Sequence, residues 1–245
     1  MKEPVKTANN GFWRSLRSGG VPSAIASVFG APSAQQMAFI RSLSREQRRP
    51  EVLYMPLSKL ETVVFDLETT GFHAQHGDEI LSFGAVKMIG DQVTDEQFYT
   101  LVNAKTNVPD NITELTGITQ EMIEGAPSLI DGLHDFMAFV GRSVLIAHGT
   151  GHDKAFLNAA LWKTSKIQLT HRILDTMMIG KWLKPSLGSY GLDELLEEAH
   201  IPITLRHHAL EDAKMTASLW GDYLRLMRHK QVDTLEDLYA YLSNF

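Results

Sequence analysis

Two acidic residues lie close together in the segment VVFDLETTG, residues 63–71. Asp66 and Glu68 are two positions apart, so on a β-strand their side chains point to the same face. Two adjacent carboxylates on an otherwise apolar strand repel each other and lose hydration, and a divalent cation offsets both costs. The alternative is that both acids lie at a strand end and cap the turn that begins at Thr69. The pair is therefore a candidate metal site.

Three further residues could complete such a site. Asp153 follows the apolar run VLIA at the start of an expected helix, where an acid also complements the helix N-terminus. His207 and Asp212 lie five positions apart at the start of a periodic helix, and alone such a pair is more typical of a protein surface. Together, four carboxylates and one histidine suit phosphodiester hydrolysis with two magnesium or manganese ions and a histidine general base.

The composition removes several competing classes of enzyme. The chain has 245 residues and no cysteine, which excludes a thiol nucleophile, a disulfide framework and a Cys-ligated zinc. No apolar run approaches the ~18 residues that span a membrane, and the segment MKEPVKTANNGFWRSLRS lacks the apolar region of a signal peptide. We therefore expect a cytoplasmic protein with no membrane partner.

Charge divides the chain into two parts. Residues 1–60 carry nine Lys and Arg residues against three acids, a formal charge of +6, whereas the remainder carries −12. We expect residues 1–58 to be a basic N-terminal extension of short helices or partly disordered chain, and residues 59–245 to be one domain. With Phe12, Trp13 and Phe29, the extension is either a solvated tail or a surface that attracts nucleic acid.

The domain carries the pattern of a sheet followed by alternating strands and helices. Runs of β-forming residues predict a three-stranded meander over 61–72, 78–93 and 95–103, and a buried strand over 144–147. Apolar residues spaced by three and four predict helices within 113–143 and over 153–163, 176–184 (preceded by Asp175), 190–201 and 207–229. The expected fold class is α/β, with a mixed β-sheet flanked by helices.

Taken together, the motifs resemble those of the DnaQ-like, or DEDDh, 3′-to-5′ exonucleases, the superfamily of the proofreading epsilon subunit of bacterial DNA polymerase III. The first motif is FDLETTG with Asp66 and Glu68, the second is AHGTGHDKAFL with Asp153, and the third is HHALEDA. Supporting matches are ELTGIT at 114–119, LDT at 174–176 and YGLDELL at 190–196. Each motif alone is weak evidence, but the ordered set, which runs from about residue 60 to 228, is specific.

The resemblance implies a ribonuclease-H-like fold, two divalent cations and stepwise release of nucleoside 5′-monophosphates from a 3′ end. It implies that Asp66 bridges both cations, that Glu68 and Asp212 hold the cation nearest the attacking water, and that Asp153 supports the second. His207 would be the general base, because it matches the His-x4-Asp spacing that His208 does not. The residues expected to bind substrate are Thr69, Thr70, Gly71, Phe72 and His148.

The second motif departs from the family pattern, His-Asn-x-x-Phe-Asp. Gly149 stands in place of the asparagine and His152 in place of the phenylalanine. The first change removes a possible contact with substrate, and the second puts a polar ring beside Asp153. These histidines also allow a different hypothesis, a single-zinc hydrolase in which His148, His152 and either His207 or His208 bind the metal.

Several functional alternatives therefore stay open. We expect the partner to be a single-stranded nucleic-acid 3′ end, with DNA favoured over RNA; the alternatives are an RNA or oligoribonucleotide exonuclease and a non-catalytic nucleic-acid or replisome adaptor. The segment QMAFI, residues 36–40, resembles the Gln-plus-hydrophobic peptide that docks polymerase-associated proteins on the sliding clamp. An ordinary amphipathic helix also explains this segment.

Overall fold

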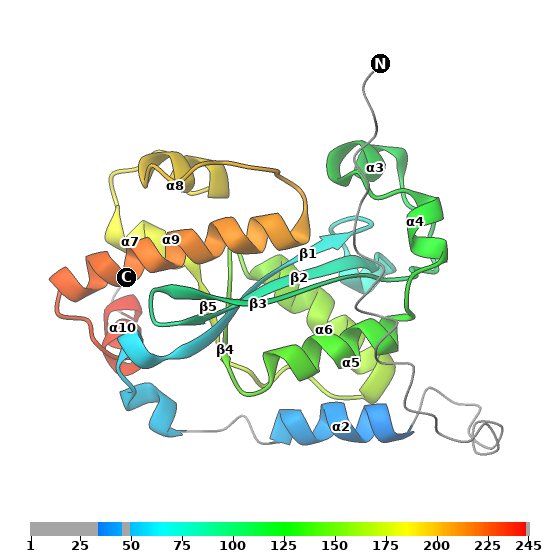
Figure 1. The fold of residues 1–245 in the computed structure, drawn as a ribbon, viewed down its shortest axis with the longest axis horizontal. Helices are drawn as coiled ribbons and strands as arrows, with labels where there is room; N and C mark the ends of the chain where they lie inside the picture. Colours follow the sequence, from blue (N-terminus) through cyan, green and yellow to red (C-terminus); the bar gives the residue numbers. More distant parts are fainter. Residues whose placement is uncertain (1–33, 46–49, 244–245) are drawn as a thin grey trace. The chain divides into compact units, whose positions relative to one another are not determined.

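The structure of the protein is a computed structural model that describes residues 34–45 and 50–243. Nearly all of these residues belong to one compact unit, Gln35–Phe245. Its centre is a five-stranded sheet in the order β3-β2-β1-β4-β5 (Figure 1). The strands are β1 (Glu61–Thr69), β2 (Ile80–Ile89), β3 (Gln92–Leu101), β4 (Val144–Ala147) and β5 (Ile173–Asp175). Strands β1, β2 and β3 form an antiparallel meander. Strand β4 pairs in parallel with β1, and β5 pairs in parallel with β4, so the predicted mixed sheet is confirmed.

Alternation along β1 separates two parts of the core. Val63, Phe65 and Leu67 face the apolar cluster that includes residues of α5 (Leu129–Val140) and α6 (Gly151–Ser165). Val64 faces a second cluster, which includes residues of α9 (Ala209–His229). Because side chains alternate, Asp66 and Glu68 share the face of Val64 and point toward the α9 side of the sheet.

The remaining helices surround this sheet. Side-chain caps begin several of them: Thr119 for α4, Ser128 for α5 and Thr234 for α10 each accept a hydrogen bond from a backbone N–H of the first turn. None of the helices in the described part of the chain combines the length and hydrophobicity that crossing a bilayer requires. The other helical elements are α2 (Ala34–Arg45), η1 (Pro50–Tyr54), η2 (Leu57–Lys59), η3 (Ala74–His76), α3 (Asp110–Thr116), α4 (Gln120–Glu124), α7 (Thr176–Leu183), α8 (Leu192–Glu198) and α10 (Leu235–Leu242).

The helix expected after Asp175 is confirmed, but the strand before it was not predicted. Ile173 and Leu174 pair with β4 as part of β5. The carboxylate of Asp175 then accepts a hydrogen bond from the backbone N–H of Met177, which starts α7 at Thr176. A three-residue strand that ends at a helix cap carries too few residues to show a period of two. Helix α10, which the sequence analysis did not predict, begins with a capping box of Thr234 and Asp237.

Part of the N-terminal segment packs on the domain. Ile40 of α2 is fully buried in the cluster that contains Phe136, and Arg41 Nε donates to the carbonyl of Ser165 at 3.0 Å. Val52 and Leu57 enter the second cluster. The predicted domain boundary at residue 58 stays a prediction. The aromatic residues proposed to attract nucleic acid lie outside the described residues: Phe12, Trp13 and Phe29.

Candidate active site

The sheet and helix α9 bring three acidic side chains together. Asp66 and Glu68 lie on β1 opposite Gly84 and Ser82 of β2. Asp212 lies in the first turn of α9 and is buried. One carboxylate oxygen from each of Asp66, Glu68 and Asp212 lies within 4.8 Å of the other two. Residues that are 144 or more positions apart in the sequence thus meet in one cluster.

A close contact between α9 and the sheet makes this cluster possible. A Cβ atom on Gly84 would lie 2.1 Å from the carbonyl carbon of Ala209 and 2.1 Å from the amide nitrogen of Leu210. Only a residue without a side chain therefore allows the first turn of α9 to lie directly on β2. The start of α9 lies beside β1 and β2 in Figure 1. Gly84 is the cross-strand partner of Asp66, so this contact occurs beside the acidic cluster.

Asp153 reaches the cluster from a third element. Strand β4 runs parallel to β1, and the loop after Ala147 leads into α6, whose first turn contains Asp153. Asp153 is 3% exposed, and its carboxylate accepts a hydrogen bond from the backbone of Leu67, the residue between Asp66 and Glu68. After burial, the charge of Asp153 is the largest cause that raises the pKa of Asp66. All four predicted carboxylates therefore interact.

Proton affinities in the cluster are strongly raised. Burial and the charges of Asp153, Glu68 and Asp212 raise the pKa of Asp66 well above its ordinary value. Burial, together with the charge of Asp212, raises the pKa of Glu68 to about 8, and burial raises the pKa of Asp153 to about 7. Such shifts mean that the ionised cluster is unstable without nearby positive charge. Raised pKa values of this kind are typical of functional sites, and a bound cation is the most economical way to offset the repulsion between the carboxylates.

The oxygen-only donor set fits hard divalent cations. Magnesium and manganese take carboxylate oxygens, and the cluster offers these from β1, α6 and α9. Among the described residues, the single group of three or more potential ligands within 4.8 Å is Asp66, Glu68 and Asp212, without a histidine. The residues present therefore fit magnesium or manganese, and they do not fit the zinc hypothesis.

Arg206 supplies positive charge inside the site. Its Nη1 donates to Asp212 Oδ1, and its Nε donates to Asp193 Oδ1 on α8. Its charge opposes the rise in the pKa values of Asp66, Glu68 and Asp212. One guanidinium thus joins α8 to the acidic cluster through two charge-assisted hydrogen bonds.

The two histidines before α9 have different surroundings. The backbone N–H of His207 donates to Asp212 Oδ2 at 2.9 Å, and its φ of 59° lies in the left-handed region that non-glycine residues rarely adopt. The ring of His208 stacks on Tyr99 with centroids 4.7 Å apart and an interplanar angle of 17°. His207 is therefore tied to the acidic cluster through its backbone, whereas His208 packs against β3.

The carboxylate of Asp175 organises the second motif. Its oxygens accept hydrogen bonds from the backbone N–H of Gly149 at 2.9 Å and of Thr150 at 3.0 Å, from the Thr150 hydroxyl at 3.1 Å and from Met177 N–H at 2.9 Å. Gly149 adopts φ 68°, a region that glycine and asparagine populate more readily than other residues. Replacing the family's asparagine by glycine thus keeps this backbone turn. His148 Nδ1 lies 3.0 Å from Thr176 Oγ1, which holds the same loop to α7.

His152 faces the end of β1. Its Nε2 lies 3.2 Å from Thr69 Oγ1, and Thr69 Oγ1 donates to the carbonyl of Gly71 at 2.7 Å. The His152 ring meets Phe72 edge-on with centroids 5.8 Å apart, and Phe72 is 76% exposed. His152 therefore supports the turn that the resemblance assigns to substrate binding. Its polar ring has a hydrogen-bonding role that the family's phenylalanine lacks.

Comparison with known proteins agrees with this arrangement. A family model for exonucleases, RNase_T, matches residues 63–220, which include all three motifs. This chain belongs to the DnaQ-like 3′-to-5′ exonuclease family. The predicted α/β fold with a ribonuclease-H-like sheet is confirmed by solved structures that share it: Exonuclease X in complex with 5′ overhanging duplex DNA, and Exonuclease I of E. coli in complex with a dT13 oligonucleotide.

These similarities differ in extent. The PolC-type DNA polymerase III of Clostridium perfringens is 38% identical over 188 residues, which cover 75% of this chain and 13% of that protein. The enzyme of the same name from Bacillus subtilis is 33% identical over 177 residues, 72% of this chain and 12% of that protein. Exonuclease X has a TM-score of 0.59 and is 20% identical, and the match covers 75% of this chain and 99% of that one. Exonuclease I has a TM-score of 0.61 and is 15% identical, and the match covers 70% of this chain and 42% of that one. The chain thus spans about an eighth of the length of its polymerase relatives.

Three residues that contribute to the site were not singled out from the sequence as part of it. Arg206 directly precedes His207, so its position was visible, but nothing in the sequence indicates that it reaches Asp193 and Asp212. Asp175 was recognised only as part of the supporting match LDT and as the residue before a helix. Gly84 lies in a strand interior, where an isolated glycine signals close approach of another backbone. That signal could have been read from the sequence.

Proposed function

We propose that this chain is a metal-dependent 3′-to-5′ exonuclease that releases nucleoside 5′-monophosphates from nucleic-acid 3′ ends, with DNA favoured. The main observation behind the proposal is that carboxylate oxygens of Asp66, Glu68 and Asp212 lie within 4.8 Å of one another. The charge of Asp153 also raises the pKa of Asp66. Membership of the exonuclease family supports the reaction class. The raised proton affinities of the cluster support a need for cations.

The four carboxylates would hold two magnesium or manganese ions. Bound divalent cations supply positive charge that stabilises the attacking and leaving oxygens of a phosphodiester. Asp66 interacts electrostatically with all three other carboxylates, Asp153, Glu68 and Asp212, which supports its proposed role as the shared ligand. Arg206 keeps Asp212 oriented by occupying one side of Oδ1.

His207 is the proposed general base. It adjoins the acidic cluster through the hydrogen bond between its backbone N–H and Asp212, and it is partly exposed, so its imidazole has access to water. His208 is less suited to this role because its ring is stacked on Tyr99. A neutral imidazole nitrogen within reach of the attacking water can accept its proton.

The terminal nucleotide would contact the turn after β1. Thr69, Thr70 and Gly71 form its backbone, and the exposed ring of Phe72 offers a flat apolar surface for a base or sugar. His148 Nδ1 is held beside Thr176 Oγ1, and the contact of His148 with substrate stays a prediction.

DNA is favoured over RNA because the named relatives are DNA polymerases and two similar structures contain DNA. One similar structure is a 3′-exonuclease that recognises a histone mRNA stem-loop, so an RNA substrate stays the alternative. A non-catalytic adaptor is a weaker alternative, because the altered second motif retains Asp153 and the turn at Gly149.

Contact with a polymerase or sliding clamp through the N-terminal extension stays a prediction, as does a cytoplasmic location. The polymerase relatives support an association with replication. The QMAFI segment offers little support for contact with a sliding clamp, because Ile40 is buried in the domain and Gln36 Nε2 donates to Asp131 Oδ1 at 2.7 Å. Two of the residues that a clamp would bind are thus used within this chain.

The proposal is tested with 5′-labelled single-stranded DNA and RNA of matched sequence, in magnesium, manganese or EDTA. We expect a metal-dependent ladder that shortens from the 3′ end, faster on DNA. The variant Asp66→Asn should give no ladder, whereas Asp95→Asn, an exposed acid on β3, should match the wild type. Failure of the wild-type protein to shorten either strand, or full activity of Asp66→Asn, would overturn the proposal.

A further inference from the structure

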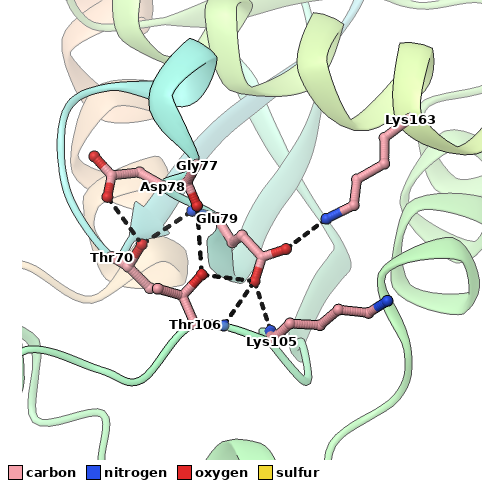
Figure 2. A network of polar contacts seen from close by, with 7 residues as sticks. All are labelled: Thr70, Gly77, Asp78, Glu79, Lys105, Thr106 and Lys163. Carbon is pink, nitrogen blue, oxygen red and sulfur yellow. Dashed lines mark hydrogen bonds and ion pairs between the residues drawn. The ribbon is translucent and has the colours of Figure 1, made fainter.

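Glu79 joins three separate segments of the chain beside the candidate active site. Its Oε2 accepts hydrogen bonds from the backbone N–H of Lys105 at 2.5 Å, from the backbone N–H of Thr106 at 2.9 Å and from the Thr106 hydroxyl at 3.0 Å. Its Oε1 accepts from Lys163 Nζ at 2.5 Å. Figure 2 shows these donors converging on the Glu79 carboxylate. The Glu79 side chain is 13% exposed, whereas that of Lys163 is 52% exposed, so water reaches the network from the side of the lysine.

The backbone of Glu79 holds the turn that follows β1. Thr70 N–H donates to the Glu79 carbonyl at 2.9 Å, and Glu79 N–H donates to Thr70 Oγ1 at 2.9 Å (Figure 2). Thr70 is two residues from Glu68, a proposed metal ligand. Glu79 therefore ties the end of β1 to the segment after β3 and to helix α6.

The loop between Thr70 and Glu79 is also closed internally. Asp78 Oδ2 accepts from His73 N–H at 2.8 Å, and Asp78 Oδ1 accepts from the Thr70 hydroxyl at 3.4 Å. A Cβ atom on Gly71 would lie 2.4 Å from Asp78 Oδ2, so the loop closes tightly around this carboxylate. The loop 70–79 is thus a compact piece whose position depends on the contacts of Glu79.

The same loop carries the most exposed large apolar side chain in the described part of the chain. Phe72 is 76% exposed although both neighbouring parts of its loop are hydrogen-bonded in place. An exposed aromatic ring on a hydrogen-bonded loop is suited to stacking on a nucleotide base. Its edge-on contact with His152 fixes the ring on one side and leaves the rest open.

The ion pair with Lys163 relates this loop to a proposed metal ligand. Lys163 and Asp153 lie on the same helix, α6, ten residues apart. A rigid helix transmits position along its axis, so anchoring the loop on Lys163 fixes Phe72 relative to Asp153. Burial alone raises the pKa of Glu79, but hydrogen bonds from Lys163, Thr106 and Lys105 bring it below its ordinary value, which favours the ionised form.

We propose that Glu79 is a positioning residue that fixes the ring of Phe72 against the 3′-terminal nucleotide of the substrate. This inference rests on the proposed exonuclease function and adds a determinant of substrate binding to it. The hydrogen bonds of Glu79 go to Thr70, Lys105, Thr106 and Lys163 and not to the acidic cluster, so it acts through the loop. Its loss therefore raises KM and leaves kcat nearly unchanged.

The test is a double-mutant cycle of Glu79→Ala and Phe72→Ala in the full chain, with kcat and KM measured on a 5′-labelled single-stranded DNA 12-mer. Each single variant should raise KM about tenfold with kcat within about twofold, and the double variant should be no worse than Phe72→Ala alone. Glu79→Gln, which keeps the oxygen that accepts from Lys105 and Thr106, should recover part of the loss. Non-additivity is the result that a role in stability alone would not give.

A matched control is available in the pair Lys87–Glu96, whose nitrogen and oxygen are 2.6 Å apart. Glu96→Ala removes a similar ion pair from β2 and β3 and should leave KM unchanged. If Glu79→Ala does not fold, Lys163→Met and Thr106→Val remove the contacts singly and should show the same coupling with Phe72→Ala. Additive effects, or a fall in kcat with unchanged KM, would overturn the inference alone, whereas a wild-type protein that cleaves neither DNA nor RNA would overturn the proposed function.

Discussion

Gly84 lies directly beneath the backbone of Ala209, at the point where helix α9 crosses strand β2. A Cβ atom there would approach the Ala209 carbonyl carbon to 2.1 Å, far inside van der Waals contact. Because Gly84 pairs with Asp66, and Asp212 follows Ala209 by three residues, this single contact sets the distance between two of the proposed metal ligands. Packing of helix on sheet and assembly of the site are therefore the same event.

Substituting Gly84 by alanine should move the start of α9 away from the sheet. We expect a loss of about 3 kcal/mol in the free energy of unfolding, because the obstructing atoms are backbone and cannot rotate away. We also expect a loss of nuclease activity larger than stability explains, since Asp212 moves with the helix. Urea denaturation and the ladder assay measure the two effects.

Gly125→Ala is the control for this substitution. Gly125 ends α4, has φ −91° and has no neighbouring atom within 4 Å of an added Cβ. It should change stability by no more than about 1 kcal/mol in either direction. If Gly84→Ala behaved like Gly125→Ala, the close approach would not be what holds Asp212 in place.

Stability in the absence of metal should fall as pH rises. Glu68 with a pKa of about 8 and Asp153 with about 7 bind protons more tightly in the folded than in the unfolded chain, where their ordinary values are 4.5 and 3.8. The stabilisation of the folded state by these extra protons is complete below pH 4 and is lost as pH rises toward 8. The free energy of unfolding falls by up to about 1.4 kcal/mol per pH unit for each extra bound proton. Urea denaturation in EDTA from pH 5 to pH 8.5 measures it.

Divalent cations should reverse this trend, because they bind the ionised carboxylates. The gain in unfolding free energy on adding manganese is therefore expected to be larger at pH 8 than at pH 5.5. Glu68→Gln removes one titrating group and should flatten the EDTA profile. A metal-free protein whose stability rises between pH 5 and pH 8 would contradict the raised proton affinities.

The acidic residues of the site were easier to predict from the sequence than the residues that position them. Asp66 and Glu68 were readable because a period of two puts them on one face of an apolar strand, which is a local property. The short strand at Ile173–Asp175 was missed because its identity comes from pairing with Leu145 and Ile146 of β4, which no local pattern encodes. Tertiary pairing with β4 decided the conformation of these three residues.

The same reasoning explains what could not be foreseen around the acids. Arg206 bonds Asp193 and Asp212 across a loop whose path depends on where α8 and α9 pack. The Glu79 carboxylate accepts hydrogen bonds from segments that lie 26 and 84 residues away in the chain. Long-range hydrogen bonds to a single carboxylate leave no periodic trace in a sequence, so only the fold reveals them.

Replacing Arg206 by methionine should impair the site more than replacing an exposed arginine. Arg206→Met removes the cation that opposes the rise in the pKa of Asp212 and also removes the bond that orients this carboxylate. We expect kcat/KM to fall about 10- to 100-fold. Arg225→Met, which breaks the exposed Arg225–Asp222 pair, should have almost no effect.

Lysine should not restore the function of Arg206. The guanidinium donates through Nε to Asp193 and through Nη1 to Asp212, and one ammonium on a flexible stem does not reproduce this fork. Arg206→Lys is therefore expected to stay within about threefold of Arg206→Met in kcat/KM. Wild-type activity in Arg206→Lys would mean that charge alone, and not geometry, is what Asp212 requires.

His207 and His208 should separate catalysis from packing. His207→Ala is expected to lower kcat about 10²- to 10⁴-fold with little change in unfolding free energy, as loss of a general base does. His208→Ala removes the ring stacked on Tyr99 and should cost about 1 kcal/mol of stability while retaining most of kcat. Parallel measurement of kcat and of urea unfolding for both variants distinguishes the roles, because the base is the histidine whose loss affects kcat and leaves stability unchanged. The reverse pattern would assign the base to His208 and make the left-handed turn at His207 a purely structural feature.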